Sequence, residues 1–536
     1  MGNMIKIFND MELIQFPREN EKITSMLCFD DCIATYGHFA GVVFEKAYID
    51  SLALDFNMSE GSSIGKSYNY GTKIEDNIRK YCGIEISTYK ANGEDCVGRI
   101  KECIDKNILV CVEVLGFNCP WDWRYQIIPN GAHYFFINGY DEQERCFNCL
   151  DPYYGVRDGS LGFDDLRKGI QSFDLFRNLG ISDTHRDIEE LIDVISSYEA
   201  DDLKGKYYRF ADSFRSFDVR KEIENYNEET ELSTDNIEND IPLNYVFKDI
   251  IHNRLRFGTY LRRLADRNPG SGDNLSMFAD RFCSLSQKWE SARLLMIKYL
   301  IVNKTDRISG SLADKLVHII DEEQDTVSGL LSSLKGRNIT NTDWGSKDMS
   351  KDSEYVFVDI DPYFNNEGIS ERKDGVSADL NDKGEYIFSD CFPVNQIYRS
   401  DRYAFKIPDK KNGRNDNIQC ESQKIKVDAD HYDGIQILGC SEWGDYEEEL
   451  TVVFDDNSVE KTSLMLNDWI PNYLQNGKRD IVIESKKYVS EDLVDEEDCN
   501  IFGVLCGIKG KKKVTEIILP ECSSMHIFAL TLLKNK

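Results

Sequence analysis

The chain has 536 residues, 41% hydrophobic and 11% aromatic, with 64 basic against 95 acidic side chains and a formal net charge of -31. That length exceeds one compact core, so two or three domains are expected. The negative charge disfavours nucleic acid and anionic membrane surfaces as partners. No apolar stretch reaches the roughly 18 residues of a membrane-spanning helix. The first residues lack the apolar core and cleavage site of a secretory signal, so a cytoplasmic protein is expected.

Residues 1–184 are the first predicted domain, in which helical patterns precede strands. Helical patterns cover 28–56 and 72–83. Strand patterns follow, and they cover 107–115, 133–141 and 146–151. Helices followed by a run of antiparallel strands indicate an α+β fold.

Residues 185–340 are dominated by apolar side chains at helical spacing, most clearly over 244–267 and 275–301. This pattern predicts an antiparallel helical bundle, whose last helix is expected to end at the favourable C-cap residue Gly336. The polar, acidic segment 225–242 within it is predicted to be a loop.

Residues 341–536 have a different pattern, with short strands between turns rich in Gly, Asn and Asp. Alternating strands at short intervals are typical of an antiparallel β-sandwich. The polar segment 337–354 is the predicted linker into this third domain.

The sixteen cysteines make up about 3% of the chain, far below the density of a disulfide scaffold. Their spacing does not match that of zinc-finger pairs, and no metal or cofactor is predicted. The one C-x-x-C pair, Cys146 and Cys149, lies in a strand-like run and not at the helix start that favours redox activity. We interpret most cysteines as reduced core residues, with Cys28 as the candidate exception.

Three residues together predict a site with an activated nucleophile. Cys28 begins a helix, whose dipole favours the thiolate, whereas Cys32 one turn later is interpreted as a packing residue. His133 opens a strand after a turn and is expected to face a cleft, and Asp151 ends the next strand. If these strands form a hairpin, the two side chains meet at its open end. Asp151 can then accept the Nδ1 proton of His133 and leave Nε2 for Cys28.

Each of these residues also has a non-catalytic explanation. A single cysteine is most often inert core, and an Asp-Pro pair at a strand end is usually just a turn. Their order, spacing and placement together favour the triad. The remaining histidines have no acidic or thiol partner at a useful spacing: His38, His185, His252, His318, His431 and His526.

The sequence resembles the butirosin biosynthesis protein H family, acyltransferases related to papain-like cysteine peptidases. The resemblance covers 25–335 and rests on CFDDCIATYGHFAG, ILVCVEVLGFNCPWDW, HYFFINGYDEQERCFNCLDPYYG and FADRFCSLSQKWESARLL. The stretch that begins at His133, HYFFINGYDEQERCFNCLDPYYG, is also similar to one in bacteriocin-processing cysteine peptidases. The resemblance implies a papain-like catalytic domain completed by the bundle. It implies Cys28 as nucleophile, His133 as general acid and base, and Asp151 as the residue that orients the imidazole.

The family's activity implies transfer of an acyl chain from a carrier-protein thioester, through an acyl-cysteine, to an amine such as a diamine. The implied partners are an acyl or peptidyl carrier protein, which holds the donor on a phosphopantetheine arm, and a small-molecule amine. The aromatic loop 120–126 and the bundle are expected to exclude water. A basic patch near the site is expected to dock an acidic carrier and comprises Arg145, Arg157, Arg167 and Lys168.

Two features depart from the family. No glutamine closely precedes Cys28 to complete an oxyanion hole, since Gln15 lies 13 residues upstream, and the second donor is therefore unassigned. The β-sandwich resembles galactose-binding-like domains, with Trp443 and Tyr446 as candidate ligand contacts. Two alternative functions are a cysteine peptidase or amide hydrolase with the same triad, and a non-catalytic glycan-binding protein.

Overall fold

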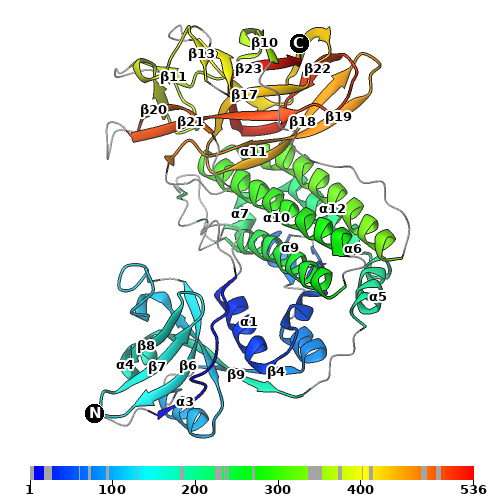
Figure 1. The fold of residues 1–536 in the computed structure, drawn as a ribbon. Helices are drawn as coiled ribbons and strands as arrows, with labels where there is room; N and C mark the ends of the chain where they lie inside the picture. The colour runs from blue at the N-terminus through cyan, green and yellow to red at the C-terminus, as the bar shows by residue number, and fades with distance from the viewer. Residues whose placement is uncertain are drawn as a thin grey trace.

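The computed structural model describes most of the chain, and its N-terminal α/β part, helical bundle and β-sandwich follow one another along the molecule (Figure 1). The described residues are 5–16, 27–59, 61–69, 74–91, 96–129, 131–180, 186–223, 232–233, 237, 241–268, 272–335, 353–371, 377–400, 402–407, 409, 414–471, 480–489 and 497–535. Within these ranges, no helix is both long enough and apolar enough to cross a membrane. The molecule is a mixed α and β structure with a C-terminal β-sandwich.

The N-terminal part is built on one sheet, in which the described strands pair antiparallel in the order β4-β9-β5-β6-β7-β8, with β1 beside β6. The strands are β1 (Ile5–Lys6), β4 (Ile84–Lys90), β5 (Val110–Leu115), β6 (Ala132–Asp141), β7 (Cys146–Asp151), β8 (Val156–Gly162) and β9 (Ile170–Asn178). A short separate ladder joins β2 (Asp55–Phe56) to β3 (Tyr68–Asn69). The expected hairpin of β6 and β7 is confirmed.

Helices cover both faces of this sheet because its strands alternate apolar residues on both sides. On one face, α1 (Cys28–Ala40) packs through Tyr36 against Phe176, with ring centroids 5.1 Å apart. On the other, Phe135 and Phe173 share a second core with two further helices. The N-terminal helices are α1, α2 (Ile74–Asn77), α3 (Cys96–Asp105) and α4 (Phe163–Gly169).

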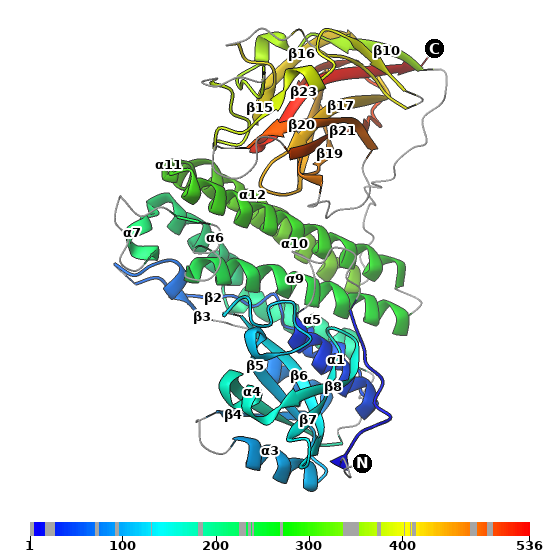
Figure 2. The same ribbon diagram turned by 90° about the vertical axis from the view of Figure 1, so that its left-hand side faces the viewer.

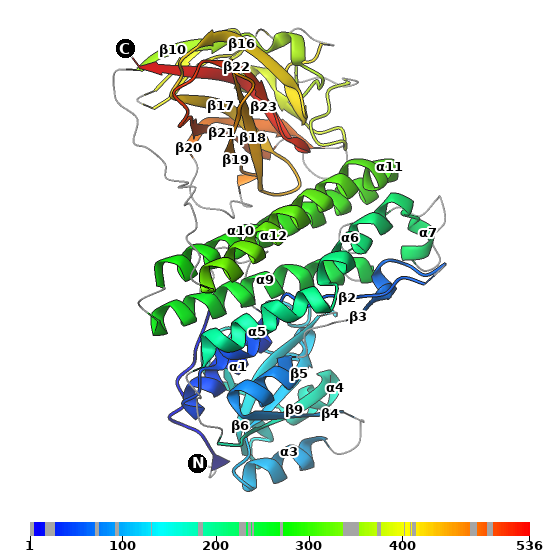
Figure 3. The same ribbon diagram turned by 90° about the vertical axis from the view of Figure 1, so that its right-hand side faces the viewer.

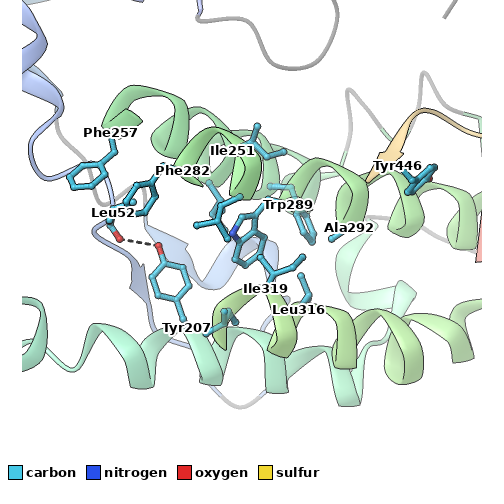
Figure 4. Packing of buried hydrophobic residues seen from close by; sticks show 14 of the residues in the cluster. Leu52, Tyr207, Ile251, Phe257, Phe282, Trp289, Ala292, Leu316, Ile319 and Tyr446 are labelled. Atoms are coloured by element: carbon cyan, nitrogen blue, oxygen red, sulfur yellow. Dashed lines mark hydrogen bonds between the residues drawn. The ribbon is translucent and has the colours of Figure 1, made fainter. Parts of the chain in front are cut away.

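The middle of the chain is helical, as expected, and its long helices run side by side (Figures 2 and 3). They pack around the fully buried Trp289, which lies among aliphatic and aromatic side chains of neighbouring helices (Figure 4). The described helices are α5 (Asp187–Ala200), α6 (Leu203–Ser213), α7 (Val219–Glu222), α9 (Pro242–Arg267), α10 (Gly272–Ile301), α11 (Thr305–Arg307) and α12 (Ala313–Leu334).

A buried ion pair joins the first turn of α1 to the bundle. Asp30 is fully buried, and its carboxylate accepts hydrogen bonds from Nε and Nη2 of Arg256 on α9, both at 3.0 Å. The same carboxylate accepts from the Tyr48 hydroxyl at 2.9 Å and from the backbone N–H of Leu27 at 3.2 Å. Asp30 therefore caps the helix on which Cys28 lies and also attaches that helix to α9.

The described part of the C-terminal domain has two large facing sheets, which confirms the predicted sandwich, and a separate two-stranded ladder of β13 and β14. One has the order β10-β23-β17-β21-β20-β12-β11 with β15 beside β23, and the other has β16-β22-β18-β19. Its strands are β10 (Ser353–Val358), β11 (Ile369–Ser370), β12 (Tyr386–Phe388), β13 (Ile397–Arg399), β14 (Ala404–Lys406), β15 (Ile418–Glu421), β16 (Lys424–Asp430), β17 (Gly434–Ser441), β18 (Tyr446–Phe454), β19 (Val459–Leu466), β20 (Asp480–Tyr488), β21 (Glu497–Gly507), β22 (Val514–Ile518) and β23 (Glu521–Asn535).

The sandwich is attached to the bundle by polar side chains of α10. The buried Lys298 ammonium contacts the carboxylate of Glu442 and lies 3.3 Å from that of Asp382. Beside it, the Tyr299 hydroxyl and Ser523 Oγ are 3.0 Å apart. One buried apolar cluster also continues from the bundle into the space between the two sheets.

The structure corrects the expected ligand contacts of the sandwich, and some other predicted features lie outside the described residues. Tyr446 is fully buried at the junction with the bundle, so it is a core residue and not a ligand contact in an exposed loop (Figure 4). Trp443 is half-buried and donates its indole N–H to the Asn381 carbonyl at 3.2 Å. Gly336, His185 and most of the predicted loop 225–242 and linker 337–354 lie outside the described residues.

Breaking the Asp30–Arg256 pair should destabilise the protein strongly. Arg256→Ala leaves a buried carboxylate without its counter-charge, which typically costs about 3–5 kcal/mol. The control on the same helix is Arg262→Ala, because the Arg262–Asp280 pair is exposed and such pairs contribute about 0–1 kcal/mol. Urea unfolding followed by tryptophan fluorescence would measure both, and equal losses in the two variants would contradict the assigned role of Arg256.

Candidate active site

The end of strand β7 creates the place that Cys28 occupies. β7 ends at Asp151, and Pro152 cannot donate to the ladder, so no described strand pairs with the start of β6 on the side opposite to β5. The N-terminus of α1 lies at this edge, and the Tyr134 backbone N–H donates to Cys28 Sγ at 3.4 Å. The sulfur is thus held between the first turn of α1 and the main chain that follows His133.

The structure brings all three predicted residues together. His133 Nε2 lies 2.6 Å from Asp151 Oδ2, and the thiol of Cys28 is within hydrogen-bonding reach of the same imidazole. Asp151 is fully buried and His133 is 2% exposed, whereas Cys28 is half-buried. The histidine therefore lies inside the protein and does not line an open cleft, because Tyr153 and Tyr154 pack against its ring at 5.4 and 5.1 Å.

The two imidazole nitrogens have the reverse of their expected partners. Nε2 bonds Asp151, which leaves Nδ1 for Cys28. The reason is geometric. Asp151 is on the neighbouring strand and is reached by Nε2, the ring nitrogen farther from the main chain of His133. Cys28 contacts the main chain of the next residue and therefore lies on the side of Nδ1, the nearer ring nitrogen. The expected chain of thiol, imidazole and carboxylate is retained with the opposite ring orientation.

Burial alone would lower the pKa of His133, but its hydrogen bonds to Asp151 and Cys28 outweigh this and raise the pKa to about 10. The imidazole is therefore protonated at neutral pH.

Neighbouring loops hold the carboxylate of Asp151 in place. Trp121 Nε1 donates to Oδ2 at 2.7 Å, and the Tyr154 backbone N–H donates to Oδ1 at 3.2 Å. The composition of the aromatic loop 120–126 predicts a water-excluding wall, but no local pattern indicates that Trp121 binds Asp151. In the same loop, Asp122 binds Arg124 through two side-chain hydrogen bonds of 2.9 and 2.6 Å.

Gln15 lies near the site but does not complete an oxyanion hole. Its amide nitrogen donates to the carbonyl oxygens of Pro152 and Tyr153, at 2.6 and 3.1 Å, so the side chain supports the loop after Asp151. The backbone N–H groups of the first turn of α1, at Cys28 and Phe29, have no acceptor within the helix. They are the donors that the site offers to a developing oxyanion.

Other predicted residues have different surroundings. Cys32 is fully buried, and burial together with the contact with Cys111 raises its pKa well above the usual range, as expected of a packing residue. None of the sixteen cysteines forms a disulfide. Among the described residues, no group of three His, Cys, Asp or Glu side chains is arranged to hold a metal ion.

The four residues of the proposed basic patch do not all lie at the same end of the hairpin: Arg157 follows Val156, the residue of β8 that pairs with Asp151, whereas Arg145 is remote from the triad. Arg145 lies in the closed turn of the β6–β7 hairpin, at the end opposite to His133 and Asp151. Arg145 and Arg167 both pair with Asp164, at 3.7 and 2.7 Å. For Arg145 the expectation was wrong because proximity in sequence to β7 does not distinguish the two ends of a hairpin.

Comparison with known proteins identifies only the C-terminal domain. Residues 354–536 match the model of the AziU2-like beta-sandwich domain. The search of curated proteins gives no match. One similar solved structure is a family GH115 4-O-methyl-alpha-glucuronidase with specificity for decorated arabinogalactans. The alignment has 9% identity, covers 65% of this chain and 41% of that protein, and has a TM-score of 0.14, too low to support any argument.

Removing the Asp151 charge should lower the pKa of His133 from about 10, because Asp151 is the strongest favourable contact of the imidazolium. Since the folded pKa lies above the usual 6.5, the stabilisation is complete below about pH 6.5 and is lost as the pH rises through about 10. NMR titration of ring-labelled histidine in the wild type and in Asp151→Asn would measure the shift. Asp158→Asn, which alters an exposed carboxylate, should leave the titration unchanged.

Proposed function

We propose that the protein is a cysteine-dependent acyltransferase that moves an acyl chain from a carrier-protein thioester to an amine. The observation that carries this proposal is the contact of Cys28 with an imidazole whose other nitrogen bonds a buried carboxylate. A helix that begins with the cysteine and a histidine on a sheet strand support a papain-like arrangement of the catalytic part. Within the butirosin biosynthesis protein H-like family, the narrower proposal is the diamine-acylating enzyme of closthioamide assembly.

In the first step, the Cys28 thiolate attacks the carbonyl carbon of the thioester. The negative charge moves to the carbonyl oxygen, where backbone N–H groups at the start of α1 stabilise it. The carrier thiol then leaves and takes its proton from His133. The products are an acyl-Cys28 thioester and a neutral imidazole.

In the second step His133 accepts a proton instead of donating one, and the sulfur of Cys28 is the leaving group instead of the attacking group. Acylation removes the sulfur charge and thiol hydrogen bond that help to raise the pKa of His133, so the neutral imidazole is the better base at this stage. His133 accepts the proton of the attacking amine, the amide forms, and Cys28 leaves as thiolate. Asp151 orients the ring in both steps and balances its positive charge whenever the imidazole is protonated.

The burial of His133 and Asp151 supports transfer to an amine in preference to hydrolysis, since water must be kept from the acyl-cysteine. The use of Gln15 in holding the 152–153 carbonyls also leaves the site without the glutamine donor of peptidase-like sites. A thioester is already activated and requires less oxyanion stabilisation than a peptide. A glycan-binding function loses support from the burial of Tyr446.

Incubation with an acyl thioester should add the acyl mass to the wild-type protein, and a diamine should discharge it as amide. Cys28→Ala should give no adduct, while Cys103→Ala, which changes another half-buried cysteine, should behave as wild type. His133→Ala should slow transfer by roughly 10²–10⁴-fold. Intact-mass spectrometry with product analysis measures all three.

Discharge to free acid without amide would support the hydrolase alternative. Failure of folded wild-type protein to form any adduct would argue against a catalytic role for the triad.

A further inference from the structure

The loop between β5 and β6 holds an arginine side chain close to the triad. Arg124 donates through Nε and Nη2 to the two carboxylate oxygens of Asp122, at 2.9 and 2.6 Å. The side chain of Asp122 is fully buried, and that of Arg124 is 17% exposed. The planar guanidinium has five N–H donors in a fixed arrangement, and this pair uses only one of its edges. The edge formed by Nη1 and Nη2 is therefore available to another acceptor.

Two glycines make room for this guanidinium. A Cβ atom on Gly116 would come within 2.6 Å of Nε, and one on Gly131 would come within 2.3 Å of Nη1. The N–H of Gly116 donates to the carbonyl oxygen of Gly131 at 2.9 Å, which continues the pairing of β5 with β6 beyond Leu115 and Ala132. Arg124 can lie directly over the end of this ladder because neither glycine has a side chain.

The remaining edge of the guanidinium lies near the reacting sulfur. Gly131 is two residues before His133, so both residues belong to the same face of the strand. Cys28 Sγ accepts from the N–H of the following residue, Tyr134. At about 3.3 Å per residue along the strand, Nη1 is on the order of 10 Å from the sulfur. Among the described residues, Nη1 has no hydrogen-bond partner.

The charges around this edge favour a neutral acceptor. The hydrogen bonds from Asp122 raise the pKa of Arg124, and the charge of Cys28 adds to this effect. Asp122 thus balances the guanidinium, as Asp151 balances the imidazolium of His133. A bound anion would add negative charge next to two buried carboxylates. A carbonyl oxygen can accept from Nη1 without changing the balance of charge.

We propose that Nη1 of Arg124 binds the carbonyl oxygen of the first amide in the leaving group of the thioester. The proposal rests on the proposed acyl transfer and assigns a subsite for the donor arm, in which two methylene groups separate the sulfur from this amide. In the tetrahedral intermediate roughly seven bonds separate Cys28 Sγ from that oxygen, about 8 Å when extended, and a hydrogen bond adds about 3 Å. This reach agrees with the position of Nη1. The contact orients the leaving sulfur toward His133, which gives it a proton.

Two thioesters of the same acid that differ in this amide test the contact. The rates of acyl-Cys28 formation would be compared for the N-acetylcysteamine thioester and for the S-pentyl thioester, which has a similar length and no amide. In Arg124→Gln the ratio of the first rate to the second should fall about ten- to hundredfold, as expected for loss of a charged hydrogen bond. The exposed Arg145 lies at the far end of the β6–β7 hairpin, and Arg145→Gln should leave the ratio unchanged.

A second variant allows for the loss of stability that Arg124→Gln can cause. Asp122→Asn combined with Arg124→Gln removes both charges and leaves no buried carboxylate without its counter-charge. It should lower the ratio as much as the single substitution does. General damage to the fold affects both thioesters and cancels in the ratio, so a wild-type ratio in both variants overturns the subsite.

Thiol–disulfide exchange separates this proposal from the proposed transfer. The Cys28 thiolate attacks N,N′-diacetylcystamine, forms a mixed disulfide and releases N-acetylcysteamine, and dipropyl disulfide reacts in the same way without an amide. Intact-mass spectrometry follows both reactions, with Cys28→Ala as the blank. If acyl-Cys28 forms but neither the thioester nor the disulfide ratio depends on Arg124, the subsite is overturned and the transferase proposal stands. If acyl-Cys28 never forms but the disulfide ratio depends on Arg124, the transferase proposal fails and the subsite stands.

Discussion

The buried pair of Asp30 and Arg256 determines where the sulfur of Cys28 lies. Asp30 caps the first turn of α1 through the Leu27 N–H and binds a guanidinium that comes from α9, 226 residues later in the chain. Charges so deeply buried persist only when paired, so α1 cannot shift without exposing or separating them. The bundle therefore helps to build the candidate site: it contacts the α1 side that faces away from the sheet and positions the helix from there (Figures 1 and 2).

His133 and Asp151, the other two residues of the site, are held in place by contacts within and beside a single hairpin. His133 and Asp151 belong to adjacent strands of one hairpin, and Trp121 and Tyr154 hold the carboxylate in place. The proposed nucleophile and its proposed base thus come from different units, a helix attached to the bundle and a hairpin within the sheet. They meet where β7 stops and β6 has a free edge.

The sandwich is coupled to the rest of the molecule through the bundle. Buried polar contacts of Lys298 and Tyr299, together with a shared apolar cluster, join α10 to the sandwich strands. Buried polar groups need matching partners, so these contacts favour one particular arrangement of the sandwich on the bundle in addition to the apolar packing. The AziU2-like match covers only this domain, and the proposed chemistry rests wholly on the N-terminal geometry.

Local sequence patterns were sufficient for much of the N-terminal fold. Alternation with period two gave β5, β6 and β7 nearly to their ends. The hairpin followed from the turn between β6 and β7, and Cys28, His133 and Asp151 were found because each lies at the boundary of such an element. Other features depend on residues distant in the chain. They include the ring orientation of His133, the burial of Tyr446, the position of Arg145 and the Asp30–Arg256 pair. Periodicity reports which face a residue occupies on its own element, whereas tertiary packing decides which other element covers that face and supplies the partner charge.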